Sequence, residues 1–461
     1  MGQFDQNCRN EDEIAPASRC RLLKISSHSR GHWLCVDTAL VADFTLKGVT
    51  HMAGAIVKQV VIIVQENHTT DNYFRSLAAY GANVATGWPT AADPPAADQP
   101  HDRLAYWKWL THQTTGEHVQ FDTLTVLPFY AYLAATAGFL ENHCAGFGTN
   151  STPNHLLLVG GQSPTLRNPP RSAAQPLWDM PSLPGLAQDH GLAWRGYTGR
   201  SQYPLDFYKQ LKGSANIVLT AQFMADALAG NLPPLSYIWH DSPLDEHPPA
   251  NVTLGQNAVW QAVDAVVRGG SWSDTVFMLT WDDWGGYDDH VATPEVEVTP
   301  DGVQVAYGPR VPLLLFGGPV RSGIDSRWCS HVSVPKTAIQ LLGLPDLGVP
   351  RLDSDPGLVD LIDTHHTNPP PPLFGATISQ PPIPHPAPAP HPLPPAPVTK
   401  PAPIGRVILR GGKTLPPPND APLPNHVGSP TNSRGKRGAT AARAKREGGR
   451  NATGATRRRG G

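Results

Sequence analysis

The fold is decided by the stretch VVIIVQEN, residues 60–67, in which a β-branched run ends on an acid and an amide. Such an uninterrupted aliphatic run is typical of a strand buried on both faces, as in a parallel sheet. A second buried strand is expected at 275–280, and Asp282-Asp283 follow it. Groups at the carboxyl ends of neighbouring parallel strands meet in one crevice, so we expect these polar residues to converge.

Helical patterns alternate with strand patterns along the chain. Helices are expected at 127–137, from 154, and at 221–229, 258–267 and 333–342, with a further strand at 311–316. This alternation predicts an α/β fold with a mostly parallel central sheet flanked by helices.

Composition divides the chain into four parts. Residues 1–51 show little periodicity, and the strong pattern begins at Met52, so we interpret 1–51 as an extension that is disordered or precedes the true start. Residues 52–366 form the expected catalytic domain. Prolines dominate 367–425, which we interpret as an extended linker. Residues 426–461 are expected to be a disordered basic tail.

Charge differs between the domain and the tail. Residues 52–366 carry about 16 Lys/Arg against about 30 Asp/Glu, whereas residues from 400 onward carry about 14 basic and 2 acidic residues. The tail is either a solvated terminus or an attachment to anionic surfaces. Nucleic acid is an unfavoured partner, because no aromatic residue interleaves the tail's charges.

The sequence gives no signal for a membrane span or for export. No apolar run approaches the ~18 to 20 residues that a span needs. Acidic residues stand near the N-terminus where a signal peptide would be basic and then apolar, so the localisation expected from this sequence alone is cytoplasmic. Of the five cysteines, Cys144 and Cys329 are interpreted as free core thiols or as one bridge.

A hydroxyl stands where a helix should begin, in the stretch STPN at 151–154. A helix N-terminus favours negative charge, so it would stabilise a phosphate and a serine alkoxide at Ser151. Asn154 lies one turn on and could donate to a phosphoryl oxygen. Taken alone, the same stretch is an ordinary helix cap.

The acidic residues predict a cation site. Two adjacent carboxylates after a strand, Asp282 and Asp283, are costly unless a cation lies between them. Glu66 and Asn67 would add oxygen ligands, although alone they would make an ordinary turn. Oxygen ligands favour one hard divalent ion, Ca²⁺, Mg²⁺ or Mn²⁺, over zinc.

Three histidines, His101, His247 and His331, complete the candidate set, although a lone His among 19 is more often a surface or core residue. The HExxH zinc motif, the P-loop and GxGxxG are absent.

Five stretches in order resemble the bacterial phosphoesterase family that contains phospholipase C enzymes and a class of acid phosphatases, with an alkaline-phosphatase-like fold. They are VQENHTTDNYF (64–74), GTNSTPNH (148–155), DEHPP (245–249), TWDDWGGYDDHV (280–291) and YGPRVP (307–312).

The resemblance implies a role for each matching residue. One divalent cation is bound by Glu66, Asn67, Asp282 and Asp283, with the Ser151 hydroxyl as a further ligand. Ser151 is the nucleophile and becomes a transient phosphoserine. Asn154, His101 and His247 surround the phosphoryl oxygens or the leaving group. His290 follows the Gly-Gly turn and is either structural or supports the site residues without contacting the substrate.

The expected function is metal-dependent hydrolysis of phosphate esters. Ser151 and the Asp-Asp pair resemble the phosphatase branch, because the phospholipase branch typically carries Thr and Asp-Glu. One alternative is phospholipase C action on phospholipid headgroups. Another is a catalytically inactive scaffold whose basic tail binds anions. Family members are often exported, which this sequence gives no sign of.

Overall fold

The computed structural model describes residues 57–169, 176–293, 295–298 and 304–379, together with two short strands at 21–24 and 33–36. The predicted basic tail and most of the predicted linker and N-terminal extension lie outside these residues. Within the extension, β1 (Arg21–Lys24) and β2 (Trp33–Val36) pair antiparallel. Among the described helices, none is long and apolar enough to cross a membrane.

An eight-stranded sheet organises the domain. Its strands are β3 (Gln59–Gln65), β4 (Gly138–Cys144), β5 (Trp194–Thr198), β6 (Ile217–Leu219), β7 (Leu235–Trp239), β8 (Thr275–Trp281), β11 (Leu313–Gly317) and β12 (Gly323–Ser330). Their order is β12-β4-β11-β8-β3-β7-β5-β6. All neighbours pair parallel except β11, which is antiparallel to both β4 and β8. The predicted α/β fold with a mostly parallel sheet is confirmed. A small separate ladder joins β9 (Glu295–Val298) and β10 (Gln304–Ala306).

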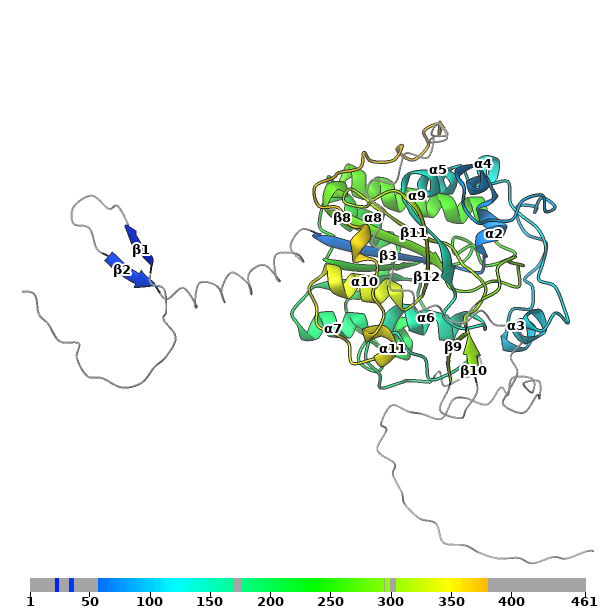
Figure 1. Ribbon diagram of the computed structural model, residues 1–461, viewed down its shortest axis with the longest axis horizontal. Coiled ribbons are helices and arrows are strands. Elements are labelled where there is room, and N and C mark those ends of the chain that lie inside the picture. The colour runs from blue at the N-terminus through cyan, green and yellow to red at the C-terminus, as the bar shows by residue number, and fades with distance from the viewer. Residues whose placement is uncertain are drawn as a thin grey trace, which may run out of the picture. The chain divides into compact units, whose positions relative to one another are not determined.

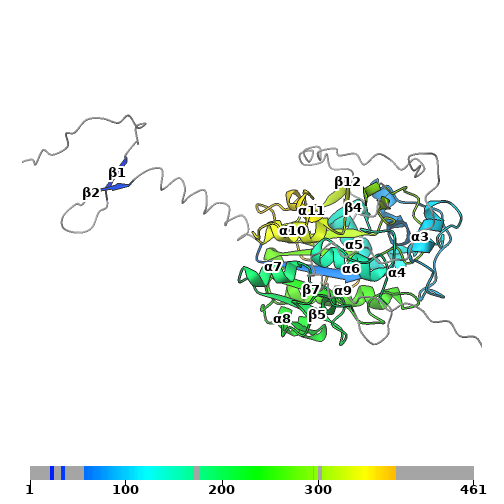
Figure 2. The same cartoon turned by 90° about the horizontal axis from the view of Figure 1, so that it is seen from below.

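Helices cover both faces of this sheet (Figure 1). The α-helices are α2 (Thr70–Tyr73), α3 (Arg103–Leu110), α4 (Thr123–Val126), α5 (Pro128–Thr136), α6 (Ser151–Gly160), α7 (Leu183–Asp189), α8 (Ala221–Leu228), α9 (Val252–Arg268), α10 (Ser333–Leu341) and α11 (Pro350–Asp353). Short 3₁₀ turns are η1 (Arg75–Tyr80), η2 (Leu205–Phe207), η3 (Trp272–Asp274) and η4 (Val359–Leu361). In the perpendicular view, α3 lies at the end of the domain away from α7 and α8 (Figure 2).

Strand β3 explains the two layers, because all seven of its residues are buried. Side chains alternate across a strand. Val61 and Ile63 therefore enter one core with residues of α5, α8 and α9, whereas Ile62 and its alternate neighbours enter the opposite core with residues of α6, α7 and α10. A continuous apolar run is what a strand covered on both faces requires.

The domain extends beyond its predicted boundary at residue 366. The Trp272 indole donates to the Asn368 carbonyl at 2.8 Å, and the Trp260 indole donates to the Pro372 carbonyl at 2.7 Å. The ring of Phe374 packs edge-on against Trp260. The backbone carbonyls of this segment accept hydrogen bonds from the domain although the segment forms neither helix nor strand. These contacts dock the first part of the proline-rich segment on the domain.

A buried arginine ties the segments around the sheet's end together. Arg310 donates to Asp289 Oδ1 at 2.9 Å and to Asp71 Oδ1 at 3.1 Å, and also to the carbonyls of Asn83 and Glu141. Arg310, Asp71 and Asp289 are all buried. Asp289 depends on this guanidinium for its neutralising charge, whereas Asp71 shares it with His290.

Arg310→Met is expected to destabilise the domain by about 3–5 kcal/mol, because it leaves the buried Asp289 without its cation and Asp71 with His290 alone. Urea unfolding of the variant and the wild type measures the loss. Arg268→Met is the matched control: Arg268 pairs with Asp264 on the surface of α9, where such a pair contributes about 0.3–0.5 kcal/mol. Equal, small losses in both variants would contradict the role given to Arg310.

Candidate functional site

The candidate site lies where β3, β8 and α6 meet. β3 and β8 pair in parallel with Gln65 opposite Trp281, so the residues that follow each strand emerge side by side. Glu66-Asn67 and Asp282-Asp283 are those residues. Ser151 is the first residue of α6 and is buried against them. The predicted convergence of these groups is what the structure shows.

Direct contacts connect the members of this site. The Asn67 backbone N–H donates to Asp282 Oδ1 at 3.0 Å. The Ser151 hydroxyl donates to Asp283 Oδ2 at 3.3 Å, and Asp283 Oδ1 accepts from the Gly285 N–H at 2.8 Å. The hydroxyl is thus held beside a carboxylate at the helix N-terminus.

Gly285 allows the two loops to approach each other. Its φ is +58°, in the left-handed region that side chains disfavour. A Cβ at this position would lie 2.2 Å from the carbonyl oxygen of Asn67. Only glycine therefore permits the loop after β8 to pass this close to the loop after β3.

The three carboxyl groups crowd one another, with Asp282 and Asp283 fully buried and Glu66 partly buried. Burial, with the charge of Glu66 adding to it, raises the pKa of Asp282 to about 6. Burial and the neighbouring Asp282 raise the pKa of Asp283 well above its usual range, and burial also raises that of Glu66. The raised pKa values show that ionising all three groups at once is costly unless a cation compensates the charge.

Two oxygen atoms of the site have no hydrogen-bond partner among the described residues. They are Asn67 Oδ1 and Asp282 Oδ2, and both are buried. The nearest basic group to Asp282 Oδ2 is His155 Nε2, 3.4 Å away. Buried oxygens without donors are costly. A hard cation would satisfy both, so the donor set of Glu66, Asn67, Asp282 and Asp283 fits such an ion.

His155 is a site residue that the sequence reasoning missed. It follows Ser151 by four residues on α6, a spacing that places both on one helix face and could have revealed it. Its Nδ1 accepts from the Trp239 indole at 3.2 Å, so Nε2 carries the proton and faces Glu66 Oε1 at 3.0 Å. Burial lowers the pKa of His155, which fits a neutral ring that orients Glu66.

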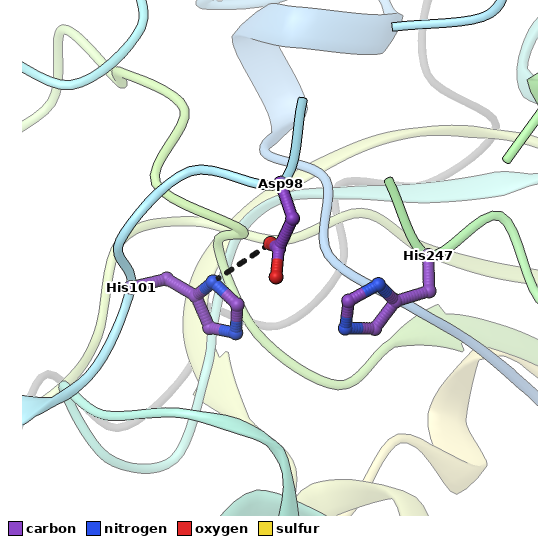
Figure 3. Close-up of side chains that lie close together, drawn as sticks. All are labelled: Asp98, His101 and His247. Atoms are coloured by element: carbon purple, nitrogen blue, oxygen red, sulfur yellow. Dashed lines mark ion pairs between the residues drawn. The ribbon is translucent and has the colours of Figure 1, made fainter. Parts of the chain in front are cut away.

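His101 and His247 lie together at the mouth of the site, beside Asp98 (Figure 3). The rings of the two histidines are 6.1 Å apart, and His101 Nε2 lies 3.4 Å from Asn67 Nδ2. Burial alone would lower the pKa of His101, but Asp283 and Asp98 raise it to about 10. The pKa of His247 is also raised. Burial alone would lower it, but the negative charge of Glu66 raises it. The mouth thus holds positive charge opposite the carboxylates.

The side chain of Asn154 forms its hydrogen bonds with the backbone of the loop before α6. Its Oδ1 accepts from the Phe147 N–H at 2.9 Å, and its Nδ2 lies 3.2 Å from the Phe147 carbonyl and 3.3 Å from the carbonyls of Thr149 and Asn150. These contacts shape the turn that presents Ser151. The predicted contact of Asn154 with a phosphoryl oxygen stays a prediction.

His290 belongs to a different cluster. Its Nδ1 lies 2.6 Å from Asp71 Oδ2, and its Nε2 lies 3.1 Å from Asn83 Oδ1. Arg310 completes this cluster through Asp71. The structure therefore places His290 in the buried arginine network, in agreement with a structural role, and gives it no contact with Ser151.

A buried carboxylate anchors the loop that carries His247. Glu246 accepts from Gln65 at 2.9 Å and Tyr130 at 2.5 Å through Oε1, and from Tyr73 at 2.7 Å and Trp281 at 2.9 Å through Oε2. All four donors are neutral, and burial raises the pKa of Glu246 to about 7. The sequence motif contained Glu246, but nothing in it indicated that this carboxylate points into the core.

Solved structures whose fold partly resembles this chain include a protein of the alkaline phosphatase superfamily from Vibrio parahaemolyticus. It is 15% identical, with a TM-score of 0.38 over 66% of this chain and 71% of that chain. Murine ectonucleotide pyrophosphatase/phosphodiesterase 5 is 11% identical, with a TM-score of 0.39 over 66% of this chain and 100% of that chain.

Sequence relatives include non-specific phospholipase C5 of Arabidopsis thaliana, 30% identical over 172 residues, which are 32% of this chain and 33% of that protein. Non-hemolytic phospholipase C of Pseudomonas aeruginosa is 23% identical over 378 residues, which cover 62% of this chain and 54% of that protein. The chain thus spans from a third to about half of these relatives. The Phosphoesterase family model matches residues 96–345, more than half of the chain. The chain therefore belongs to the Phosphoesterase family.

Proposed function

We propose that this chain hydrolyses phosphate esters in a divalent-cation-dependent reaction, with Ser151 as the nucleophile. The observation that carries the proposal is the position of the Ser151 hydroxyl, 3.3 Å from Asp283 Oδ2 at the N-terminus of α6. Family membership and the phospholipase C relatives support this reaction class.

The cation is proposed to bind Glu66, Asn67, Asp282 and Asp283, with the Ser151 hydroxyl as a further ligand. The two buried oxygens without partners, Asn67 Oδ1 and Asp282 Oδ2, support this assignment. Oxygen ligands favour Ca²⁺, Mg²⁺ or Mn²⁺. Such an ion lowers the pKa of a coordinated hydroxyl and neutralises phosphoryl charge.

The proposed reaction has two steps. The Ser151 hydroxyl gives its proton to Asp283, which already accepts its hydrogen bond, and Oγ forms a bond to phosphorus while the bond to the ester oxygen breaks. The departing alcohol takes a proton from the histidine side of the site, where His101 and His247 lie. Water then cleaves the phosphoserine and releases phosphate. Positioning and charge neutralisation account for most of the acceleration in such transfers.

Phospholipase C action on lipid headgroups is a second candidate, favoured by the names of the relatives. In that case the basic residues after 400 would hold the enzyme at an anionic membrane surface. The Ser151 and Asp282-Asp283 pattern favours the phosphatase reaction instead.

Ser151→Ala is expected to lower the turnover of p-nitrophenyl phosphate by roughly 10³-fold or more, because no other group replaces the nucleophile. The thermal unfolding of the variant should match the wild type. Ser273→Ala, at an exposed position in η3 and at the opposite end of β8 from Asp282, is the control and should retain activity. Full activity in Ser151→Ala would refute the mechanism.

Substrate preference separates the two candidates. We expect the full chain with Mn²⁺ to cleave p-nitrophenyl phosphate faster than p-nitrophenylphosphorylcholine, and a chelator to stop both reactions. A clear preference for the phosphorylcholine ester would assign phospholipase C action. Cleavage of neither by the folded, metal-loaded chain would favour the scaffold alternative.

The cation should also change how stability depends on pH. The pKa of Asp282 is raised from its usual value near 4 to about 6. Without metal, its protonation therefore contributes fully to the stability of the fold below about pH 4, and this contribution is lost as the pH rises through about 6. The metal-free wild type should therefore lose more Tm between pH 5 and pH 8 than Asp282→Asn does. Mn²⁺ should raise the wild-type Tm most at pH 8. Identical pH profiles for the two proteins would contradict this account.

A further inference from the structure

A tyrosine from the loop after β5 reaches the N-terminus of the helix that carries Ser151. β5 pairs in parallel with β7, and β7 pairs in parallel with β3, so the loop after β5 leaves the sheet at the same edge as the loops of the site. Tyr203 lies in this loop, and its hydroxyl is 3.2 Å from Oγ1 of Thr152, the residue that follows Ser151 on α6. Tyr203 is only partly buried, so part of it remains open to a molecule that enters from solution.

Two aromatic rings and one side-chain amide hold this contact in place. The ring centroid of Tyr203 lies 5.0 Å from that of His155 and 5.7 Å from that of Phe207, and both pairs are close to perpendicular. Perpendicular packing of this kind is a favourable arrangement of aromatic rings. On the other side of the contact, the Thr152 N–H donates to Asn168 Oδ1 at 2.7 Å. The fold therefore positions the Tyr203 hydroxyl.

The two hydroxyl groups have one more proton than their mutual contact uses. Each hydroxyl carries one proton and can also accept a hydrogen bond. Within the described part of the chain, the contact with Thr152 is the one hydrogen bond of the Tyr203 hydroxyl. A phenol is a stronger donor than an aliphatic alcohol, so the favoured arrangement has Thr152 donating to Tyr203 and Tyr203 offering its own proton to another acceptor. Hydrogen bonds in such a chain strengthen one another.

The Tyr203 phenol keeps its proton near neutral pH. Burial raises the pKa of Tyr203 well above its usual value, and the negative charges of Glu66, Asp282 and Asp283 raise it further, against the opposing effect of the contact with Thr152. The influence of these three carboxyl groups shows that the hydroxyl lies within the electric field of the site. A neutral donor in this place can approach a phosphoryl oxygen without adding negative charge to the site.

We propose that Tyr203 contacts the substrate, that its hydroxyl donates to a phosphoryl oxygen, and that this contact selects phosphate monoesters over diesters. The inference rests on the proposed function, because it assumes that Ser151 attacks phosphorus. In such a transfer the attacking and leaving oxygens lie roughly in line, and charge spreads over the other three oxygens. A donor beside the residue that carries the nucleophile suits one of these three oxygens, whereas the histidines serve the leaving oxygen.

The charge of the phosphoryl group decides which substrates gain from this donor. A monoester dianion spreads its charge over three unesterified oxygens, whereas a diester carries a single negative charge on two. Hydrogen bonds to charged acceptors are the stronger ones, so the more highly charged monoester gains more from the Tyr203 hydroxyl. A diester that turned its esterified oxygen toward Tyr203 would offer a weak acceptor and would bring its substituent against the ring.

The kinetic test compares Tyr203→Phe with the wild type, as full chains with Mn²⁺. The substrates are p-nitrophenyl phosphate and p-nitrophenylphosphorylcholine, which release the same alcohol. We expect kcat/KM for the monoester to fall roughly 10²-fold, mainly in kcat, because a donor to the transition state is lost. The diester should lose much less. Thr152→Val should change the same ratio in the same direction but less, because it removes only the supporting donor.

Tyr132→Phe is the matched control, because Tyr132 is also partly buried but packs with α5 against the other core of the sheet. It should behave like the wild type, and all variants should retain the same metal content after dialysis. An equal loss for both substrates, or a loss of metal in Tyr203→Phe, would make Tyr203 a supporting residue of the fold and overturn the proposal. Unchanged kinetics in Tyr203→Phe would overturn it as well.

Orthovanadate binding, measured by calorimetry, tests the same contact without turnover. Vanadate adopts the five-coordinate geometry that phosphorus passes through during transfer. The wild type with Mn²⁺ should bind it roughly tenfold or more tightly than Tyr203→Phe does, as expected for one hydrogen bond to a charged oxygen. Tighter binding by a wild type that cleaves neither ester would support the contact and count against the proposed function. Equal binding by the two proteins, or binding by neither, would refute the contact.

Discussion

The repulsion among three crowded carboxyl groups, two of them buried and one partly buried, is the constraint on which the rest of the site depends. Glu66, Asp282 and Asp283 are brought together by the parallel register of β3 and β8, and burial raises the pKa of each. A fold would not retain this arrangement for its own stability, since unpaired buried charge is costly. The crowding makes sense as a preformed receptor for positive charge.

The surrounding elements keep that receptor in shape. The Gly285 turn lets the loop after β8 approach Asn67, and the His331 ring contacts the Asp282 carbonyl at 2.6 Å. His155 fixes Glu66 from the same helix face that presents Ser151. Because these supports come from separate segments, the fold itself holds the Ser151 hydroxyl and the surrounding oxygen atoms in place, which is the condition that the proposed function requires for electrostatic catalysis.

The sequence predicted the elements with the clearest periodicity. β3, β8, α5, α8 and α10 lie within a few residues of their expected bounds, because long apolar patterns report burial directly. β4 was missed because Glu141, Asn142 and His143 interrupt its apolar pattern.

The antiparallel direction of β11 was also unforeseen, and it brings Arg310 to the site's edge from the strand's N-terminal side. Sequence reasoning that considers only the residues after each strand does not find Arg310, because Arg310 precedes its strand. The contacts of Asn154, His290 and Asp98 depend on loop geometry that no short motif encodes.

The anchoring of Glu246 has an evolutionary consequence. Four neutral donors from β3, α2, α5 and β8 share one carboxylate, so losing any one of them leaves a buried acceptor unsatisfied. Substitutions at these positions are expected to be strongly epistatic, with each tolerated only alongside compensating changes. Surface positions that share no buried partner, such as Arg268 on α9, are instead expected to tolerate substitution one at a time.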